Sequence, residues 1–307
     1  MSYTAEISRT NPSCLLFLID QSGSMADPFG AGESSKSKAD AVADAINNLL
    51  RNLTIKCAKG EGVRDYYEVG VIGYGSSVSS AFKGELDGQG FVPISQVANN
   101  PFRIEERIKK VDDGAGGLVD QKIRFPVWFE SSASGGTPMC QALNLARGSL
   151  TDWLNHHPSS FPPIVINVTD GGATDGDPTT EAEALRDLSS DDGNVLLFNL
   201  HLSSQRNTPV EFPDSAEALP DQYAKLLFSL SSLLPPYMQD FARQENYSVS
   251  EKTRGFVFNA DIVSVIRFLD IGTRPSKLLM ALKSGLFVVF YVSMLINNID
   301  INRSISF

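Results

Sequence analysis

Cysteine and histidine are scarce in this chain: 307 residues contain three of each. The cysteines, Cys14, Cys57 and Cys140, are widely spaced, and Cys14 falls inside an apolar run. This spacing indicates neither a disulfide framework nor a zinc site.

An excess of basic residues is also missing, because acidic residues outnumber them and the formal net charge is -10 at pH 7. Nucleic-acid-binding surfaces need clustered positive charge, so we expect no nucleic-acid partner. The first residues, MSYTAEISRTNPS, are polar and lack the apolar core of a secretory signal. We therefore expect a cytoplasmic protein.

Motifs of common enzyme classes are missing as well. The chain has no G-x-x-x-x-G-K-[ST] loop, no dinucleotide fingerprint and no G-x-S-x-G at a nucleophile elbow. His156 and His157 lie in a Pro/Ser-rich loop, and His201 alternates with leucines on an expected strand. A phosphotransferase would need more direct carboxylates and a placed Lys or Arg. We expect no enzymatic activity; a Mg²⁺-dependent hydrolase or phosphotransferase is the alternative.

Short apolar runs alternate with segments of helical spacing along most of the chain. Strands are expected at 14–19, 67–74, 125–129, 163–169, 194–202 and 256–259. Helices are expected at 38–53, 139–153, 179–190 and 261–270, and a pair of helices, broken at Pro235-Pro236, at 223–242. This alternation predicts an α/β fold with a mostly parallel sheet and helices on both faces. Residues 78–86 are expected to form an edge strand beside 67–74, and 104–111 a short helical piece.

The segment CLLFLIDQSGSM, Cys14–Met25, carries the most information. An uninterrupted apolar run is typical of a strand buried on both faces of a parallel sheet. Asp20, Ser22 and Ser24 follow it on a tight loop, with small oxygen-bearing side chains that suit a hard cation such as Mg²⁺. A polar turn followed by a helix cap explains the same residues without a metal.

Two other segments repeat this chemistry after apolar runs: Gly136-Thr137-Pro138, and Thr169-Asp170-Gly171. Carboxyl ends of parallel strands meet at one edge of a doubly wound sheet. We therefore expect these loops and the Asp20 loop to meet over a single point.

The ordered set D-x-S-x-S, Thr and Asp resembles the metal-ion-dependent adhesion site of the von Willebrand factor A domain. Every position of that pattern has a match: Asp20, Ser22, Ser24, Thr137 and Asp170. The resemblance covers roughly residues 12–270 and is of the bacterial stand-alone type. It implies a Rossmann-like, doubly wound sheet with one antiparallel edge strand. It also implies a bound Mg²⁺, with Mn²⁺ or Ca²⁺ as alternatives.

Hydroxyl ligands complete a coordination shell without cancelling the charge of the cation, so a site of this kind stays electrophilic. An Asp or Glu carboxylate from another protein would suit the remaining position. We therefore expect a metal-dependent protein-protein interaction module. A structural scaffold with a vestigial metal site is the alternative.

For four nearby residues, a role in metal binding and an ordinary structural role are both open. Gln21 and Thr169 could tune the site from behind its ligands or simply provide turn polarity. Asp175 and Asp177 could hold a second cation, but a loop turn and a helix N-cap explain them more simply.

The resemblance ends near residue 272, so we expect a domain at 1–272 and an apolar tail at 273–307. Within the tail, residues 278–296 form a run of borderline length for a membrane helix, with Lys283 inside it. Packing against the domain or a partner is favoured over membrane association through this run.

Overall fold

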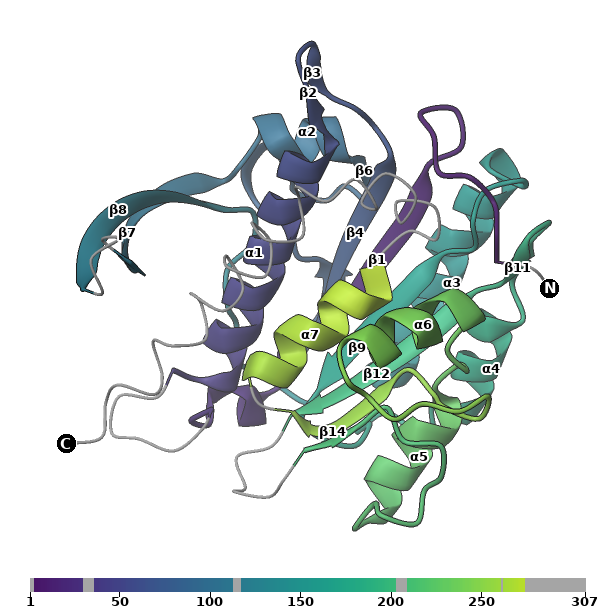
Figure 1. Cartoon of the computed structure of the whole chain (residues 1–307). Coiled ribbons are helices and arrows are strands. Elements are labelled where there is room, and N and C mark those ends of the chain that lie inside the picture. Colours follow the sequence, from purple (N-terminus) through teal and green to yellow (C-terminus); the bar gives the residue numbers. More distant parts are fainter. Residues whose placement is uncertain (1–2, 30–35, 113–116, 203–208, 261, 274–307) are drawn as a thin grey trace.

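The computed structural model describes residues 3–29, 36–112, 117–202, 209–260 and 262–273. Its centre is an eight-stranded sheet in the order β13-β14-β12-β9-β1-β4-β5, with β6 pairing on β4 (Figure 1). The strands are β1 (Ser13–Asp20), β4 (Tyr67–Tyr74), β5 (Val78–Ser80), β6 (Val92–Pro93), β9 (Ile164–Thr169), β12 (Leu196–Leu202), β13 (Val210–Glu211) and β14 (Phe256–Ala260).

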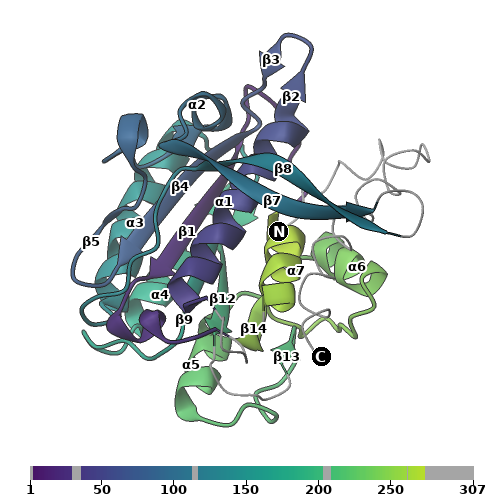
Figure 2. The same ribbon diagram turned by 90° about the vertical axis from the view of Figure 1, so that its left-hand side faces the viewer.

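Helices cover both faces of this sheet (Figures 1 and 2). They are α1 (Lys38–Cys57), α2 (Ile94–Asn99), α3 (Met139–His156), α4 (Thr179–Arg186), α5 (Gln222–Leu230), α6 (Pro236–Gln244) and α7 (Ile262–Thr273). The expected Rossmann-like α/β fold is confirmed. Its antiparallel edge strand is β5, and the two-residue strand β13 adds an antiparallel pair at the opposite edge.

Strand β1 shows why the apolar run at 14–19 predicted a doubly covered sheet. Leu15, Phe17 and Ile19 point into a core shared with α1, α6 and α7. The alternate residues, such as Leu16 and Leu18, point into a second core shared with α3, α4 and α5. Because successive side chains of a strand point to opposite faces, both faces require apolar residues.

The chain reverses its direction of winding at β1. Strand β1 pairs in parallel with β4 on one side and with β9 on the other. The chain therefore leaves β1 toward β4 and returns through α3 to β9 across it. Ligands of open α/β sheets bind at the carboxyl ends of strands beside such a switch point.

Residues 103–127 differ from the sequence-based expectation. The helical piece expected at 104–111 is strand β7 (Arg103–Asp112), and it pairs with β8 (Leu118–Val127) in a separate two-stranded ribbon. Apolar residues at 104, 108 and 111 have helical spacing by coincidence. The strand expected at 125–129 therefore belongs mostly to β8 and lies outside the central sheet.

The ribbon passes over α1 and extends beyond the body of the domain (Figure 2). Near its base, the guanidinium of Arg107 donates a hydrogen bond to the carboxylate of Asp44 in α1. The central carbon of the same guanidinium lies 3.6 Å from the centre of the Phe125 ring. Farther out, Ile108 and Leu118 are 67% and 63% exposed.

Smaller elements complete the described chain. They are the hairpins β2 (Ala58–Lys59) with β3 (Gly62–Val63) and β10 (Ser189–Ser190) with β11 (Gly193–Asn194), and the 3-10 helices η1 (Gly23–Ala26) and η2 (Gly84–Leu86). None of the helices in the described ranges is long and apolar enough to cross a membrane. The apolar run at 278–296 and all of the tail after residue 273 lie outside the described residues, as does Asp261, the first residue of the helix expected at 261–270.

Candidate functional site

Asp20 and Asp170 lie together because β1 and β9 are neighbouring parallel strands. Asp20 ends β1 and is fully buried. Its Oδ1 accepts a hydrogen bond from the backbone N–H of Ser22 at 2.8 Å, and its Oδ2 accepts one from the Thr169 hydroxyl at 2.6 Å. Thr169 is the last residue of β9, so a direct side-chain contact joins the two strand ends.

The two serines of the Asp20 loop connect Asp20 to Asp170 through hydrogen bonds. Oγ of Ser22 and Oγ of Ser24 are 3.1 Å apart, and Ser24 donates to Oδ1 of Asp170 at 2.7 Å. Ser24 lies on the short helix η1, and its hydrogen bond to Asp170 places its side chain beside the end of β9. The structure therefore brings Asp20, Ser22, Ser24 and Asp170 into one hydrogen-bonded cluster, as the sequence predicted.

Thr137 lies just before the N-terminal end of α3, and its loop contacts the Asp20 loop, because the N–H of Gly23 donates to the carbonyl of Gly135 at 3.1 Å. The backbone N–H of Thr137 donates to Oγ1 of Thr174, and its carbonyl accepts from the N–H of Thr174, both at 2.9 Å. Thr174 lies four residues after Asp170, so the two loops are linked directly. The expectation that the Thr137 loop follows a strand of the main sheet is wrong, because β8 belongs to the ribbon.

Backbone contacts hold the Asp20 and Thr137 loops against the end of β4. Gln21 donates its N–H to the carbonyl of Tyr74 at 2.7 Å and accepts from the N–H of Ser134 at 2.7 Å. A Cβ on Gly75 would lie 2.6 Å from the carbonyl oxygen of Gln21 and 2.7 Å from that of Ser134. Only glycine allows this approach.

The contacts of Gln21 and Thr169 show what each residue does beside the predicted metal ligands. The Gln21 side chain lies against Gly73, where an added Cβ would be 2.3 Å from its Oε1. Thr169 donates to the buried carboxylate of Asp20 and accepts from the N–H of Gly171. Thr169 thus orients a predicted metal ligand, and Gln21 joins loops through its backbone.

Lys38 is the residue of this site that the sequence reasoning missed. It is the first residue of α1, is only 4% exposed, and donates from Nζ to Oδ2 of Asp170 at 2.8 Å. The signal was available: a lysine begins a helix, where the positive end of the helix dipole disfavours a cation. Such a lysine needs nearby carboxylates.

A buried polar chain beneath the site was also missed. The Tyr74 hydroxyl donates to Oδ1 of Asn167 at 2.7 Å, and Nδ2 of Asn167 donates to Oδ1 of Asn199 at 2.9 Å. Asn199 in turn binds Oγ of Ser231 at 3.0 Å. The chain ties β4, β9, β12 and the end of α5 together. An asparagine in the middle of the apolar run PIVINVT was its sequence signal.

Asp175 and Asp177 accept hydrogen bonds at the starts of α3 and α4, whose N-cap residues are Pro138 and Pro178. Both oxygens of Asp175 accept backbone N–H groups of α3, from Cys140 and Gln141. Oδ1 of Asp177 accepts the backbone N–H and the hydroxyl of Thr179, at the start of α4. These contacts agree with the simpler reading of the two residues.

Burial and hydrogen bonding act in opposite directions on the carboxyl of Asp20. Burial raises the pKa of Asp20 above its ordinary value, and hydrogen bonds from Thr169 and Ser22 oppose that rise. The nearby charge of Asp170 raises the pKa of Asp20 further. A buried pair of carboxylates of this kind gains free energy from a cation beside it.

The donor set fits a small, hard cation. Neighbouring oxygens around an octahedral Mg²⁺ lie about 2.9 Å apart, given metal–oxygen distances of about 2.1 Å. The Ser22–Ser24 and Ser24–Asp170 oxygen pairs lie at 3.1 and 2.7 Å. Among the described residues, no group of three or more His, Cys, Asp or Glu side chains is placed to hold a metal. Any cation here would depend on the hydroxyls.

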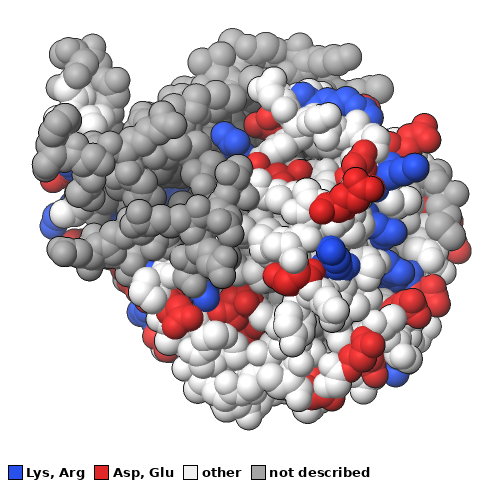
Figure 3. Space-filling model, turned by 90° about the horizontal axis from the view of Figure 1, so that it is seen from below, with Lys and Arg blue, Asp and Glu red and all other residues white. Residues whose placement is uncertain are grey.

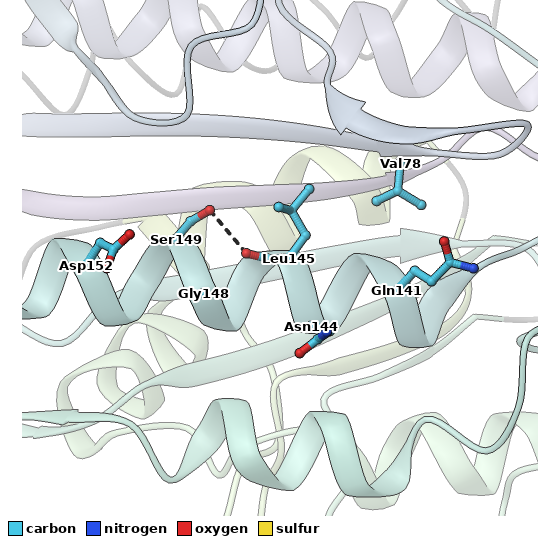
Figure 4. A pocket seen from close by; sticks show the side chains of 7 residues that line it. All are labelled: Val78, Gln141, Asn144, Leu145, Gly148, Ser149 and Asp152. Carbon is cyan, nitrogen blue, oxygen red and sulfur yellow. Dashed lines mark hydrogen bonds between the residues drawn. The ribbon is translucent and has the colours of Figure 1, made fainter.

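Figure 3 views the protein from the carboxyl ends of the strands, with Lys and Arg interspersed among Asp and Glu on the visible described surface. A shallow surface hollow lies elsewhere, along the outer side of α3 (Figure 4). It is lined by Val78 and by α3 residues such as Asn144 and Ser149, and by none of the predicted site residues.

No family model matches the chain, and no curated protein matches it. Solved structures give partial alignments. The ArnB paralog VWA2 from Sulfolobus acidocaldarius aligns at 15% identity over 63% of this chain and 36% of its own, with a TM-score of 0.32. The vWF domain of the type V pili tip protein Mfa5 from Porphyromonas gingivalis aligns at 14% identity over 55% and 40%, with a TM-score of 0.29.

The pilus adhesin RrgA from Streptococcus pneumoniae aligns at 16% identity over 56% of this chain and 22% of its own, with a TM-score of 0.28. The aligned part thus spans less than half of each of these proteins. At such TM-scores the likeness carries no argument about function. The mixed α/β sheet and its switch point are established by the strand order and by the parallel pairing of β1 with β4 and β9.

Proposed function

We propose that this chain is a protein-interaction module that binds an acidic side chain of a partner through a divalent cation, Mg²⁺. Asp20, Ser22, Ser24, Thr137 and Asp170 would hold the cation. The observation that carries the proposal is the continuous cluster of Asp20, Ser22, Ser24 and Asp170 at the switch point of the sheet.

The residues of the site have distinct tasks in this proposal. Ser22, Ser24 and Thr137 offer neutral oxygens, while Asp20 and Asp170 supply negative charge. Thr169 fixes the orientation of the Asp20 carboxylate. When bound, the cation supplies a Lewis-acidic position that accepts a carboxylate oxygen. Such a module needs no turnover, so we propose that the chain is not an enzyme.

The first prediction concerns metal binding by the protein alone. Asp20→Ala should weaken Mn²⁺ binding by at least about tenfold, because it removes one of two carboxylates beside the cation. Mn²⁺ serves as a paramagnetic probe for Mg²⁺, and electron paramagnetic resonance measures the free fraction. Asp152→Asn, an exposed acidic residue on α3, is the control with the same loss of charge and should bind as wild type does.

Partner capture completes the test. Wild type and Asp20→Ala would each be used to retain partners in Mg²⁺ or in EDTA. A partner retained only by wild type in Mg²⁺ supports recognition through the cation. Equal retention in all four conditions would contradict it and favour the scaffold with a vestigial site, and loss of turnover in Ser22→Ala would favour an enzyme.

A further inference from the structure

Lys38 places a fixed positive charge inside the proposed cation site. Its side chain is 5% exposed and that of Asp170 is 1% exposed, with 2.8 Å between Nζ and Oδ2. Lysine is almost never buried to this degree unless it is paired. Asp170 thus already has a cationic partner, on the oxygen that Ser24 does not use.

The position of Lys38 at the start of α1 makes this arrangement costly by itself. The N-terminus of a helix carries partial positive charge and favours anions. Two carboxylates offset that cost: Asp170, and Asp27, whose Oδ2 lies 3.5 Å from Nζ. The backbone N–H of Lys38 also donates to the carbonyl of Asp27 at 2.9 Å, which keeps the two residues together.

We propose that Lys38 is a built-in competitor of the divalent cation that also sets the charge preference of the loaded site. This inference rests on the proposed function. Its first part follows from Asp170, which serves both cations: the ammonium lowers the affinity of the site for metal. Asp27 is 58% exposed and gives the ammonium a second, solvated partner when Asp170 binds the metal.

The second part follows from counting charges. The buried charged side chains, Asp20, Asp170 and Lys38, together carry one net negative charge, and the carboxylate of Asp27 is left out of this count because it is 58% exposed and solvated. A divalent cation therefore leaves the buried part of the site with one net positive charge. A partner carboxylate then neutralises it. Without Lys38 the loaded site would be neutral, and a carboxylate would bring an uncompensated negative charge into a largely buried place. Lys38 therefore favours an anionic ligand over a neutral one.

Lys38→Met tests both parts, because methionine keeps most of the length of the side chain and removes its charge. We expect Mn²⁺ to bind this variant about tenfold more tightly than wild type, since one positive charge beside Asp170 is gone. Acetate, used as a carboxylate probe, should bind the Mn²⁺-loaded variant more weakly than the loaded wild type. Titration calorimetry measures both affinities.

Two controls accompany the variant. Lys36→Met removes the same charge two residues away, from an exposed lysine paired with Asp44, and should leave both affinities unchanged. Lys38→Arg keeps the charge and should bind Mn²⁺ about as wild type does. Thermal melting in EDTA checks folding: Lys38→Met should melt lower than wild type, because Asp170 is left unpaired, and Mn²⁺ should restore more of its stability.

The outcomes separate this inference from the proposal beneath it. Tighter Mn²⁺ binding with weaker acetate binding supports the role of Lys38. Equal or weaker Mn²⁺ binding by a folded Lys38→Met overturns that role and leaves the metal site intact. Failure of wild type and of Lys38→Met to bind Mn²⁺ at millimolar concentration overturns the proposed function itself, and the inference with it.

Discussion

His201 is a half-buried imidazole on β12, one strand away from the candidate site. Its ring stacks on Phe258 with 4.7 Å between centroids, and its Nδ1 has no hydrogen-bond partner among the described residues. Burial lowers the pKa of His201 from its ordinary value of 6.5 to about 4, against the opposing effect of Asp221 and Asp170. The folded protein therefore favours the neutral ring.

This residue makes stability depend on pH with a definite sign. Between pH 6.5 and about 4 the unfolded chain binds a proton at His201 that the folded chain does not, so stability is full above pH 6.5 and falls as the pH falls. At pH 5 we expect a loss of about 2 kcal/mol relative to pH 7.5 from this group. Urea unfolding at the two pH values measures it.

His201→Phe is the matched variant for that measurement, because it keeps the stacked ring and removes the titrating nitrogens. Its stability should decrease less than that of wild type between pH 7.5 and pH 5. Parallel pH profiles for the two proteins would show that His201 does not contribute. The comparison also cancels the titration of Asp20, whose raised pKa acts in the opposite direction.

At the scale of elements, the ribbon of β7 and β8 differs from the rest of the fold. Its base is anchored by Phe125 and Val127, which are 5% and 3% exposed, while Ile108 and Leu118 farther out are mostly exposed. Joining Arg107 directly to Ile123 through an Asn-Gly turn would remove the outer part. Because the apolar residues Ile108, Leu118 and Val119 of that part are exposed, we expect a change in stability within about 1 kcal/mol.

Phe125→Ala is the contrasting variant at the base of the ribbon. It removes a buried ring that also lies under the guanidinium of Arg107, and should cost about 3 to 5 kcal/mol. Thermal or urea unfolding of both variants gives the comparison. A large loss in the shortened ribbon would mean that its outer part packs against the domain. Mn²⁺ binding should persist in the shortened chain.

The ribbon also shows where prediction from sequence ended. The strands of the central sheet were predictable because burial on both faces leaves uninterrupted apolar runs such as CLLFLI. Strand β7 has a charged sequence with apolar residues at helical spacing, and only its pairing with β8 makes it a strand. Ile104 and Ile108 of β7 are exposed, so the strand shows no alternation of buried apolar and exposed polar residues, and the pattern alone favoured a helix.

The candidate site divides in the same way. Asp20, Ser22 and Ser24 are adjacent in sequence, and the parallel sheet places Asp170 beside them, so their meeting was predictable. The sequence indicates that a lysine at the start of a helix needs carboxylates nearby, but it does not predict that Lys38 points inward to Asp170, because the first residue of a helix can equally face solvent. The link between Thr137 and Thr174 depends on how two loops close, which local sequence does not specify.

For the whole molecule, the site joins parts of the chain that are far apart in sequence. Ser24 and Asp170 are separated by 146 positions, and Lys38 and Asp170 by 132. A ligand that binds this cluster binds only the folded chain, since unfolding separates its donors. Metal binding should therefore stabilise the fold as a unit and not one loop alone.

The expected size of this effect follows from mass action. At a Mg²⁺ concentration about 100 times the Kd, binding adds about 2.7 kcal/mol, which corresponds to a rise of about 5 °C in Tm for a domain of this size. Differential scanning calorimetry in Mg²⁺ and in EDTA measures it. Ser24→Ala should melt close to wild type in EDTA, because Ser24 is exposed, and should lose most of the rise in Mg²⁺. An equal rise in both proteins would place the bound metal away from this cluster.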